Sequence, residues 1–306
     1  MSFDEKKATT DWENDNIILG IDEAGRGPVM GPMVYACAYW KEEYDNDIRK
    51  KFKFNDSKAL NPKERERMFE QIKSHPNIIR YELIVLTSEY ISKEMLKRQK
   101  VSLNQISQDS AKTLIKMARD KKVNVRKIYV DTVGPADSYR ILLESSLNDK
   151  NIKVTVEPKA DAKYECVSAA SIVAKVTRDK HIEIIEKEDK DCGSGYPSDP
   201  KTKEWLKNNY DNIFGFGREV RFSWKTIDSM FKENNNKCEW EDYDSEVEAE
   251  KIKKLKKVKG KGKGKEDEKE NIKIDSIMIK EDKDIKKKNV IRNFYEKNNI
   301  DFNVEL

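Results

Sequence analysis

Acidic residues close three of the apolar segments of this sequence. The pair Asp22–Glu23 ends one apolar run, Asp131 ends a second and Asp161 follows a third. An unpaired carboxylate costs several kcal/mol to bury. Positions of this kind therefore call for an explanation in chemistry or in local structure.

A divalent metal ion would explain all four acidic residues. Carboxylates that lie close together raise one another's pKa, and a cation removes the repulsion. The chain has two histidines, His75 and His181, and its four cysteines show no CxxC spacing. Oxygen ligands would therefore hold the ion, as Mg²⁺ and Mn²⁺ prefer. Two such ions about 3.5–4 Å apart clamp the attacking and leaving oxygens in phosphodiester hydrolysis.

Each acidic residue also has an ordinary explanation. A single Asp at a strand end is more often a turn or helix cap than a ligand, and this applies to Asp131 and Asp161. The adjacent pair Asp22–Glu23 inside an apolar frame is harder to explain in this way. The combination favours a metal site.

The glycines after this pair have two interpretations. Gly25, Gly27 and Gly31 miss the GxGxxG spacing by one residue, so a dinucleotide site is unsupported. Glycines on both sides of Arg26 would let backbone amides approach a sugar or phosphate closely. A hairpin turn is the simpler alternative.

The elements that must position these residues alternate between strands and helices. Strands are expected over 17–22, 33–40, 78–87, 127–131 and 152–161, and helices over 61–73, 102–120, 138–147 and 164–187. This alternation predicts an α/β fold. Because the first three strands look antiparallel, a mixed sheet is expected.

Composition divides the chain into four parts. Of the 306 residues, 37% are hydrophobic and 39% are charged, and the net charge of +4 allows a polyanionic partner without requiring one. We expect a disordered lead (1–16), a folded region (17–234), a charged low-complexity linker (235–288) and a short apolar segment (289–306) that docks on a partner or folds back. No run is long enough for a membrane span, and the polar start is no signal peptide, so an intracellular protein is expected.

Several motifs resemble one family. "GIDEAGRGPVMGPMVYA" resembles the opening signature of the type 2 ribonucleases H. "DSKAL", "VDTVG", "KADAKYECVSAASIVAKVTRD", "GSGYPSDPKTKEWL" and "RFSWKT" follow in the same order and resemble the eukaryotic catalytic subunit over roughly residues 17–230. The long motifs in register make the resemblance specific.

The resemblance implies a fold and an activity. It implies a ribonuclease H-like mixed sheet flanked by helices, with a C-terminal helical extension. It also implies hydrolysis of RNA in RNA–DNA hybrids and incision 5′ of single ribonucleotides in duplex DNA, leaving 3′-hydroxyl and 5′-phosphate ends. Two Mg²⁺ (or Mn²⁺) ions would bind at Asp22, Glu23, Asp131 and Asp161.

The resemblance also implies substrate contacts and partners. Gly25, Arg26 and Gly27 match a loop that reads the ribose 2′-hydroxyl, and Tyr196 matches a tyrosine that packs on the sugar at the RNA–DNA junction. Plausible phosphate contacts are Lys58, Lys175 and Arg178. A heterotrimer with two non-catalytic subunits, a nuclear location and a role in DNA replication and repair follow from the same resemblance.

Two other functions compete with this one. A ribonuclease H-fold DNA nuclease would need the carboxylates but no reader of the 2′-hydroxyl, so Arg26 and Tyr196 argue against it. A non-catalytic nucleic-acid scaffold would need neither, and the intact carboxylates argue against that function.

Overall fold

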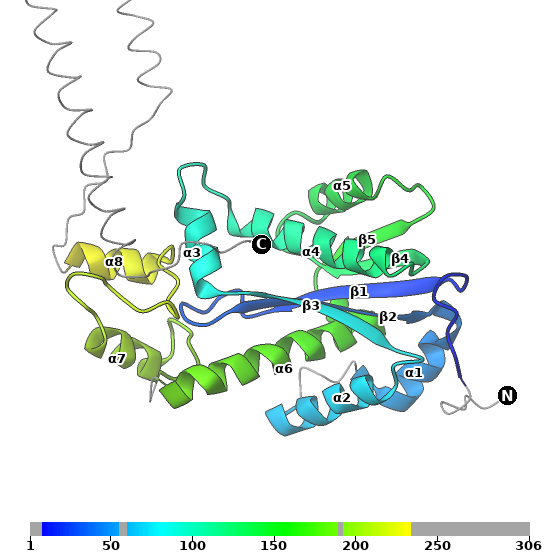
Figure 1. Ribbon diagram of the computed structural model, residues 1–306, viewed down its shortest axis with the longest axis horizontal. Coiled ribbons are helices and arrows are strands. Elements are labelled where there is room, and N and C mark those ends of the chain that lie inside the picture. The colour runs from blue at the N-terminus through cyan, green and yellow to red at the C-terminus, as the bar shows by residue number, and fades with distance from the viewer. Residues whose placement is uncertain (1–7, 55–59, 189–191, 234–306) are drawn as a thin grey trace, which may run out of the picture. The chain divides into compact units, whose positions relative to one another are not determined.

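A mixed sheet forms the centre of the fold. The computed structural model describes residues 8–54, 60–188 and 192–233. Its strands are β1 (Ile17–Ala24), β2 (Met33–Lys41), β3 (Arg80–Leu86), β4 (Val125–Asp131) and β5 (Lys153–Glu157). They lie in the order β3-β2-β1-β4-β5 (Figure 1). β2 is antiparallel to β1 and β3, whereas β1, β4 and β5 are parallel, which confirms the mixed sheet.

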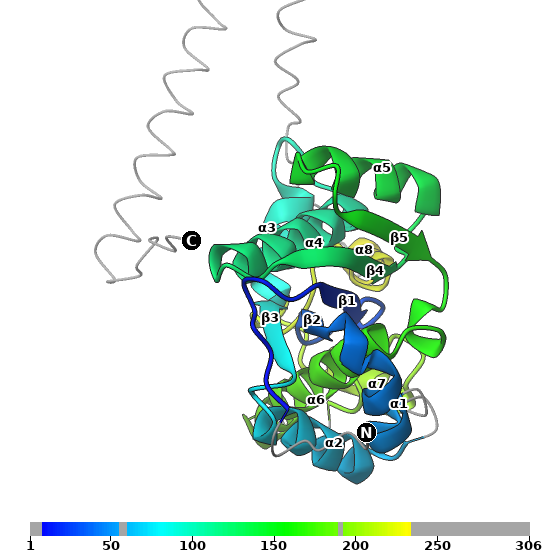
Figure 2. The ribbon, with the colours of Figure 1, turned by 90° about the vertical axis from the view of Figure 1, so that its right-hand side faces the viewer.

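Helices cover both faces of the sheet. The described helices are α1 (Asp45–Phe52), α2 (Pro62–Ser74), α3 (Ser88–Leu96), α4 (Leu103–Asp120), α5 (Ala136–Leu147), α6 (Glu165–Glu188), α7 (Pro200–Asn208) and α8 (Lys225–Glu233). α4 and α5 pack on one face, and α1, α2 and α6 pack on the other (Figures 1 and 2). The sheet is therefore the middle layer of three.

Local capping signals mark the start of two of the longer helices. Asn61 caps α2 through a capping box with Glu64, and Ser102 caps α4 by accepting from the Gln105 amide. The two helices that the sequence did not predict, α1 and α3, have eight and nine residues. Segments of that length are marginal as isolated helices, and packing on the sheet stabilises them.

Part of the expected disordered lead is packed against the sheet. The Trp12 ring makes an edge contact with Tyr39, and the Arg80 guanidinium lies 4.2 Å from the centre of the Trp12 ring. The Trp12 carbonyl also accepts a hydrogen bond from the Asn124 amide. Trp12 and several backbone hydrogen bonds, among them Thr10 amide to Asn77 carbonyl, thus hold residues 8–16 against the fold, and composition alone does not reveal this.

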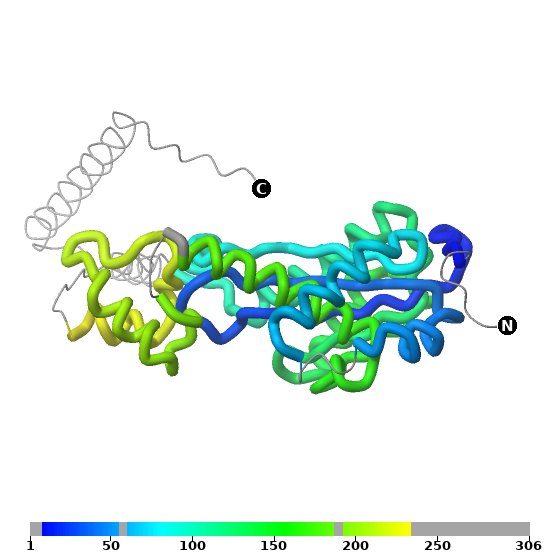
Figure 3. Tube along the Cα trace, turned by 90° about the horizontal axis from the view of Figure 1, so that it is seen from below, coloured from blue at the N-terminus to red at the C-terminus, as the bar shows by residue number. Residues whose placement is uncertain are grey.

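A third apolar cluster ties the C-terminal helices to the loop between β1 and β2. It contains Val29 and Met30 from that loop, Leu206 from α7 and Ile227 from α8. Met30 also pairs with Val220 as an isolated β-bridge. Figure 3 shows α7 and α8 gathered at one end of α6. The predicted C-terminal helical extension is confirmed.

Some predictions fall outside the described residues. These are the charged tract 235–288, the apolar segment 289–306 and Lys58. Among the described helices, none has the length and apolar character of a membrane span.

One glycine sets how closely α6 approaches the sheet. A Cβ atom on Gly20 of β1 would lie 2.2 Å from the Cys166 carbonyl carbon and 2.3 Å from the Val167 amide nitrogen. Real Cβ atoms do not come so close to backbone, and a helix backbone cannot move aside as a side chain can. Gly20 is thus required for the contact between β1 and α6.

We predict that Gly20→Ala lowers the free energy of unfolding by about 3 kcal/mol, because the methyl group overpacks this contact. Urea denaturation followed by circular dichroism measures the change. Gly217→Ala is the matched control, because nothing lies within 4 Å of its Cβ position. It should stay within about 0.5 kcal/mol of wild type. Equal stability of the two variants would contradict the close approach.

Candidate active site

Three aspartates meet beside α6. Ile21 of β1 pairs with Val130 of the parallel strand β4, so the next residues along these strands, Asp22 and Asp131, are neighbours. Asp161 belongs to the 3₁₀ turn Ala160–Ala162, just before α6. The Ala160 amide donates a 3.0 Å hydrogen bond to Asp131 Oδ1, which connects this turn to the end of β4.

The surroundings of Asp22 disfavour its charged form. The side chain is 6% exposed. Its pKa is raised from 3.8 to about 7, chiefly by burial and also by the nearby Asp131 and Asp161, while a Ser171 hydroxyl in α6 opposes the rise. A cation beside the three aspartates would remove both the burial cost and the repulsion.

Glu23 lies on the other face of the sheet. Successive side chains of a strand alternate between its faces, so Glu23 turns away from Asp22. It pairs across the strands with Tyr35 of β2, which belongs to the α4–α5 side of the core. Burial raises the pKa of Glu23 to about 8; the negative charges of Asp22 and Asp131 contribute to the rise, and Arg26 opposes it.

The donor chemistry of the four residues fits Mg²⁺ or Mn²⁺. All the side-chain donors are carboxylate oxygens, and burial raises the pKa of both Asp22 and Glu23, a cost that a cation would offset. In the described part of the chain, no three Asp, Glu, His or Cys side chains are already spaced to enclose one ion.

Gly25, next to the acidic pair, is required by the packing. Gly25 has a φ of +82°, and a Cβ there would lie 2.6 Å from the Pro32 carbonyl oxygen and 2.7 Å from Cδ of Arg178. Only glycine adopts this conformation in so little space. The Arg26 guanidinium donates to Ser107 Oγ at 2.6 Å and to the Asn104 side-chain oxygen, both in α4.

Arg221 holds this loop in place, and the sequence did not point to it. Its fully buried guanidinium donates to the carbonyls of Gly31 (2.9 Å), Arg26 (3.2 Å) and Gly25 (2.7 Å). Burial, reinforced by the charge of Arg178, lowers its pKa to about 9. The segment "RFSWKT" contains Arg221, but a single arginine in a motif does not reveal which backbone it will bind.

Tyr196 lies against the same loop. Its ring is 3.4 Å from the Cβ position of Gly27, and the side chain is 40% exposed. The Arg178 guanidinium lies 5.5 Å from the ring centre and donates to the Ser194 carbonyl at 3.0 Å. The buried Arg178 thus supports the turn that carries Tyr196. Lys175, one turn earlier in α6, is half-buried.

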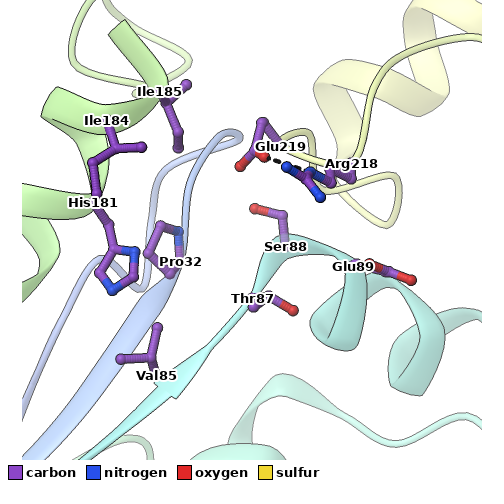
Figure 4. Close-up of a pocket in the computed structure, with 10 residues that line it drawn as sticks. All are labelled: Pro32, Val85, Thr87, Ser88, Glu89, His181, Ile184, Ile185, Arg218 and Glu219. Carbon is purple, nitrogen blue, oxygen red and sulfur yellow. Dashed lines mark hydrogen bonds and ion pairs between the residues drawn. The ribbon is translucent and has the colours of Figure 1, made fainter. Parts of the chain in front are cut away.

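A separate hollow lies beyond this loop. It has a volume of about 280 Å³ and is lined by residues that include Pro32, Val85, His181 and Ile184 (Figure 4). Its rim carries an ion pair between Arg218 and Glu219. None of the ten predicted site residues that the structure describes lines this hollow, so the predicted active-site residues lie elsewhere.

We predict that Asp22→Asn stabilises the metal-free protein in a pH-dependent way. Below pH 3.8 Asp22 is protonated in both states; between 3.8 and about 7 only the unfolded state loses the proton, so wild-type stability falls as pH rises. An Asn at this position does not titrate, so the variant avoids this loss of stability. Its free energy of unfolding should exceed that of the wild type by a few kcal/mol at about pH 7.

Chemical denaturation in EDTA at several pH values measures this gain. Asp120→Asn, at an exposed position of α4, is the control and should follow the wild type. If the free energies of unfolding of Asp22→Asn and wild type change with pH in parallel from about pH 4 to 8, burial of Asp22 does not disfavour its charged form.

Comparison with known proteins gives the family. The family model described as Ribonuclease HII matches residues 19–227. The chain is 46% identical over 235 residues to a ribonuclease H2 subunit of Homo sapiens, and the match covers 75% of this chain and 77% of the relative. It is 43% identical over 231 residues to the corresponding ribonuclease H2 subunit of Dictyostelium discoideum, and the match covers 72% of this chain and 79% of that relative.

Solved structures agree with these relatives. The crystal structure of ribonuclease H2 from Pyrococcus horikoshii OT3 matches with a TM-score of 0.62 and 35% identity, over 72% of this chain and 99% of that one. The structure of Bst-RNase HIII in complex with Mn²⁺ has a TM-score of 0.58 at 20% identity, over 73% and 71% of the two chains, and shows the shared fold. The chain therefore belongs to the ribonuclease HII family, as a relative of these ribonuclease H2 subunits, and is a ribonuclease H that hydrolyses RNA in RNA–DNA hybrids.

Proposed function

We propose that this ribonuclease also incises duplex DNA on the 5′ side of single embedded ribonucleotides, and that it does so by two-metal-ion catalysis. The products would carry 3′-hydroxyl and 5′-phosphate ends. The observation that carries the proposal is the juxtaposition of two groups at the end of β1: the carboxylates, and a glycine loop that contacts an exposed tyrosine.

The carboxylates supply the metal-binding part. Asp22, Asp131 and Asp161 would hold divalent ions on the α6 side, and Glu23 would contribute from the neighbouring position of β1. When bound, two such ions supply positive charge at the attacking and leaving oxygens of the phosphodiester. The buried setting of Asp22 strengthens its interaction with a cation, because little water screens it.

The loop and Tyr196 supply the recognition of ribose. The 2′-hydroxyl is the group by which a protein distinguishes RNA from DNA. The carbonyls of Gly25, Arg26 and Gly27 already accept from Arg221 and Trp224. The amides of this loop, which has no side-chain bulk at either glycine, would therefore approach that hydroxyl. Tyr196 presents an exposed ring beside Gly27 and offers a flat surface for the sugar at the junction.

Phosphate contacts complete the proposed substrate site. Lys175, on the half-exposed side of α6, and Lys58 would bind phosphates. Arg178 is buried and bonded to the Ser194 carbonyl, so its contribution would come mainly through the loop and Tyr196.

The relatives are named as subunits of ribonuclease H2, which implies a multi-subunit complex. We propose two non-catalytic partner subunits, a nuclear location, and a role in removing ribonucleotides during DNA replication and repair. The segment 289–306, outside the described residues, remains a predicted docking element.

We predict that Asp22→Asn and Asp131→Asn each lower kcat by at least about 100-fold, because each removes a metal-binding charge. Hybrid binding should change little, since phosphate contacts dominate affinity. Single-turnover cleavage and fluorescence anisotropy separate the two effects. Asp120→Asn is the surface control. Near-normal turnover in either site variant would refute the metal assignment.

We predict that Tyr196→Ala affects the two substrates unequally. Incision at a single ribonucleotide should fall about tenfold more than cleavage of a long hybrid, because stacking on an aromatic ring contributes about 1–3 kcal/mol and a hybrid offers many alternative sites. Cleavage rates measured side by side on the two duplexes give the ratio of the two activities. Tyr196→Phe, which keeps the ring, should show the wild-type ratio. Equal losses on both substrates would exclude a junction-reading role.

A further inference from the structure

Three buried hydroxyls lie next to the Asp22–Glu23 pair without a completed hydrogen bond. Tyr35 and Tyr139 are 1% exposed and Ser171 is fully buried. Within residues 8–54, 60–188 and 192–233, none of the three hydroxyls has a hydrogen-bond partner. Leaving a buried hydroxyl unpaired costs about 1–3 kcal/mol. A Phe or an Ala would fill the same space without that cost, so packing does not account for the hydroxyls.

Two of these hydroxyls surround Glu23. Tyr35 is its direct cross-strand partner on β2, so both side chains leave the sheet on the same face. Tyr139 comes from α5 and belongs to the same buried cluster as Tyr35, on the face of the sheet to which Glu23 points.

The other polar groups on this face already have partners. Ser107 donates to the Leu103 carbonyl at 2.8 Å and accepts from Arg26. The Arg26 guanidinium is directed at Ser107 and Asn104. Among the described residues around Glu23, the two tyrosine hydroxyls are therefore the donors left over for its carboxylate.

Asp22 has the same arrangement on the opposite face. α6 contacts Gly20 through Val167 and Gly25 through Arg178, so the buried Ser171, which lies between Val167 and Arg178, is placed beside Asp22. Each carboxylate of the pair thus has at least one buried hydroxyl to itself, and the three hydroxyls come from three different elements, β2, α5 and α6.

We propose that Tyr35, Tyr139 and Ser171 are positioning residues: when metal ions are bound, they donate hydrogen bonds to Glu23 and Asp22 and hold both carboxylates in the orientation in which they bind the ions. The proposal rests on the proposed metal-binding role of the acidic pair. Groups that hold metal-binding side chains typically contribute about 10–100-fold to metal affinity.

The test measures Mn²⁺ affinity directly. Isothermal titration of the full-length chain with Mn²⁺ compares wild type with Tyr35→Phe, Tyr139→Phe and Ser171→Ala. Each variant should bind Mn²⁺ about tenfold more weakly. Each should unfold at the same or a higher denaturant concentration in EDTA, because an unpaired buried hydroxyl is gone.

A matched control separates this role from packing. Tyr39 lies on β2 on the same face as Tyr35 and is fully buried, but its hydroxyl donates to Glu82 at 3.0 Å, away from the acidic pair. Tyr39→Phe should lose stability and keep wild-type Mn²⁺ affinity. If Tyr35→Phe keeps its stability and loses Mn²⁺ affinity, Tyr35 has a positioning role.

A double variant of Tyr35 and Glu23 tests the positioning role separately from the proposed metal-binding role of Glu23. In a Glu23→Gln background, Tyr35→Phe should cause no further loss of affinity, because the group it positions is already changed. Wild-type affinity in all three hydroxyl variants, with a loss in Glu23→Gln, would overturn the positioning role and leave the metal site intact. Wild-type affinity in Glu23→Gln would overturn the proposed role of Glu23 as a metal ligand. Additive losses in the double variant would overturn positioning through Glu23, because Tyr35 would then act by another route.

Discussion

The parallel pairing of β1 with β4 is the constraint on which the site depends. Its register places Asp22 beside Asp131 at the strand ends, and the chain that leaves β5 brings Asp161 to them just before α6. This contact needs α6 to lie directly on β1, which Gly20 permits because it has no side chain. A shift of one residue in the pairing would move the carboxylates to the wrong faces of the sheet.

The acidic pair divides its charge between the two faces. Asp22 faces α6 with the other aspartates, and Glu23 faces the tyrosines of β2 and α5. Both carboxyl groups have a raised pKa, chiefly because they are buried. The protein thus keeps residues that weaken its metal-free fold, as is common where a site is built to receive a cation.

The C-terminal helices are connected to the site through Arg221. Its three hydrogen bonds to the carbonyls of Gly25, Arg26 and Gly31 bind the loop after β1 to a segment almost 200 residues later in the chain. Trp224 adds a hydrogen bond to the Gly27 carbonyl at 3.1 Å. The region that follows α6 therefore fixes the backbone proposed to face the substrate, and α7 and α8 pack around the same loop.

The sequence by itself determined the strand–helix order, the mixed sheet, the capped helix at Asn61 and the acidic residues of the site, because hydrophobic period, capping residues and motif order are local properties. It did not determine α1 and α3, the packing of Trp12, or the role of Arg221, since each depends on a contact with a distant segment. The strand predicted from the sequence ended at Asp22, which left the direction of Glu23 open. Only the tertiary structure decided that β1 continues to Ala24, because pairing with β2 extends over Glu23 and Ala24 and so turns Glu23 to the face opposite Asp22.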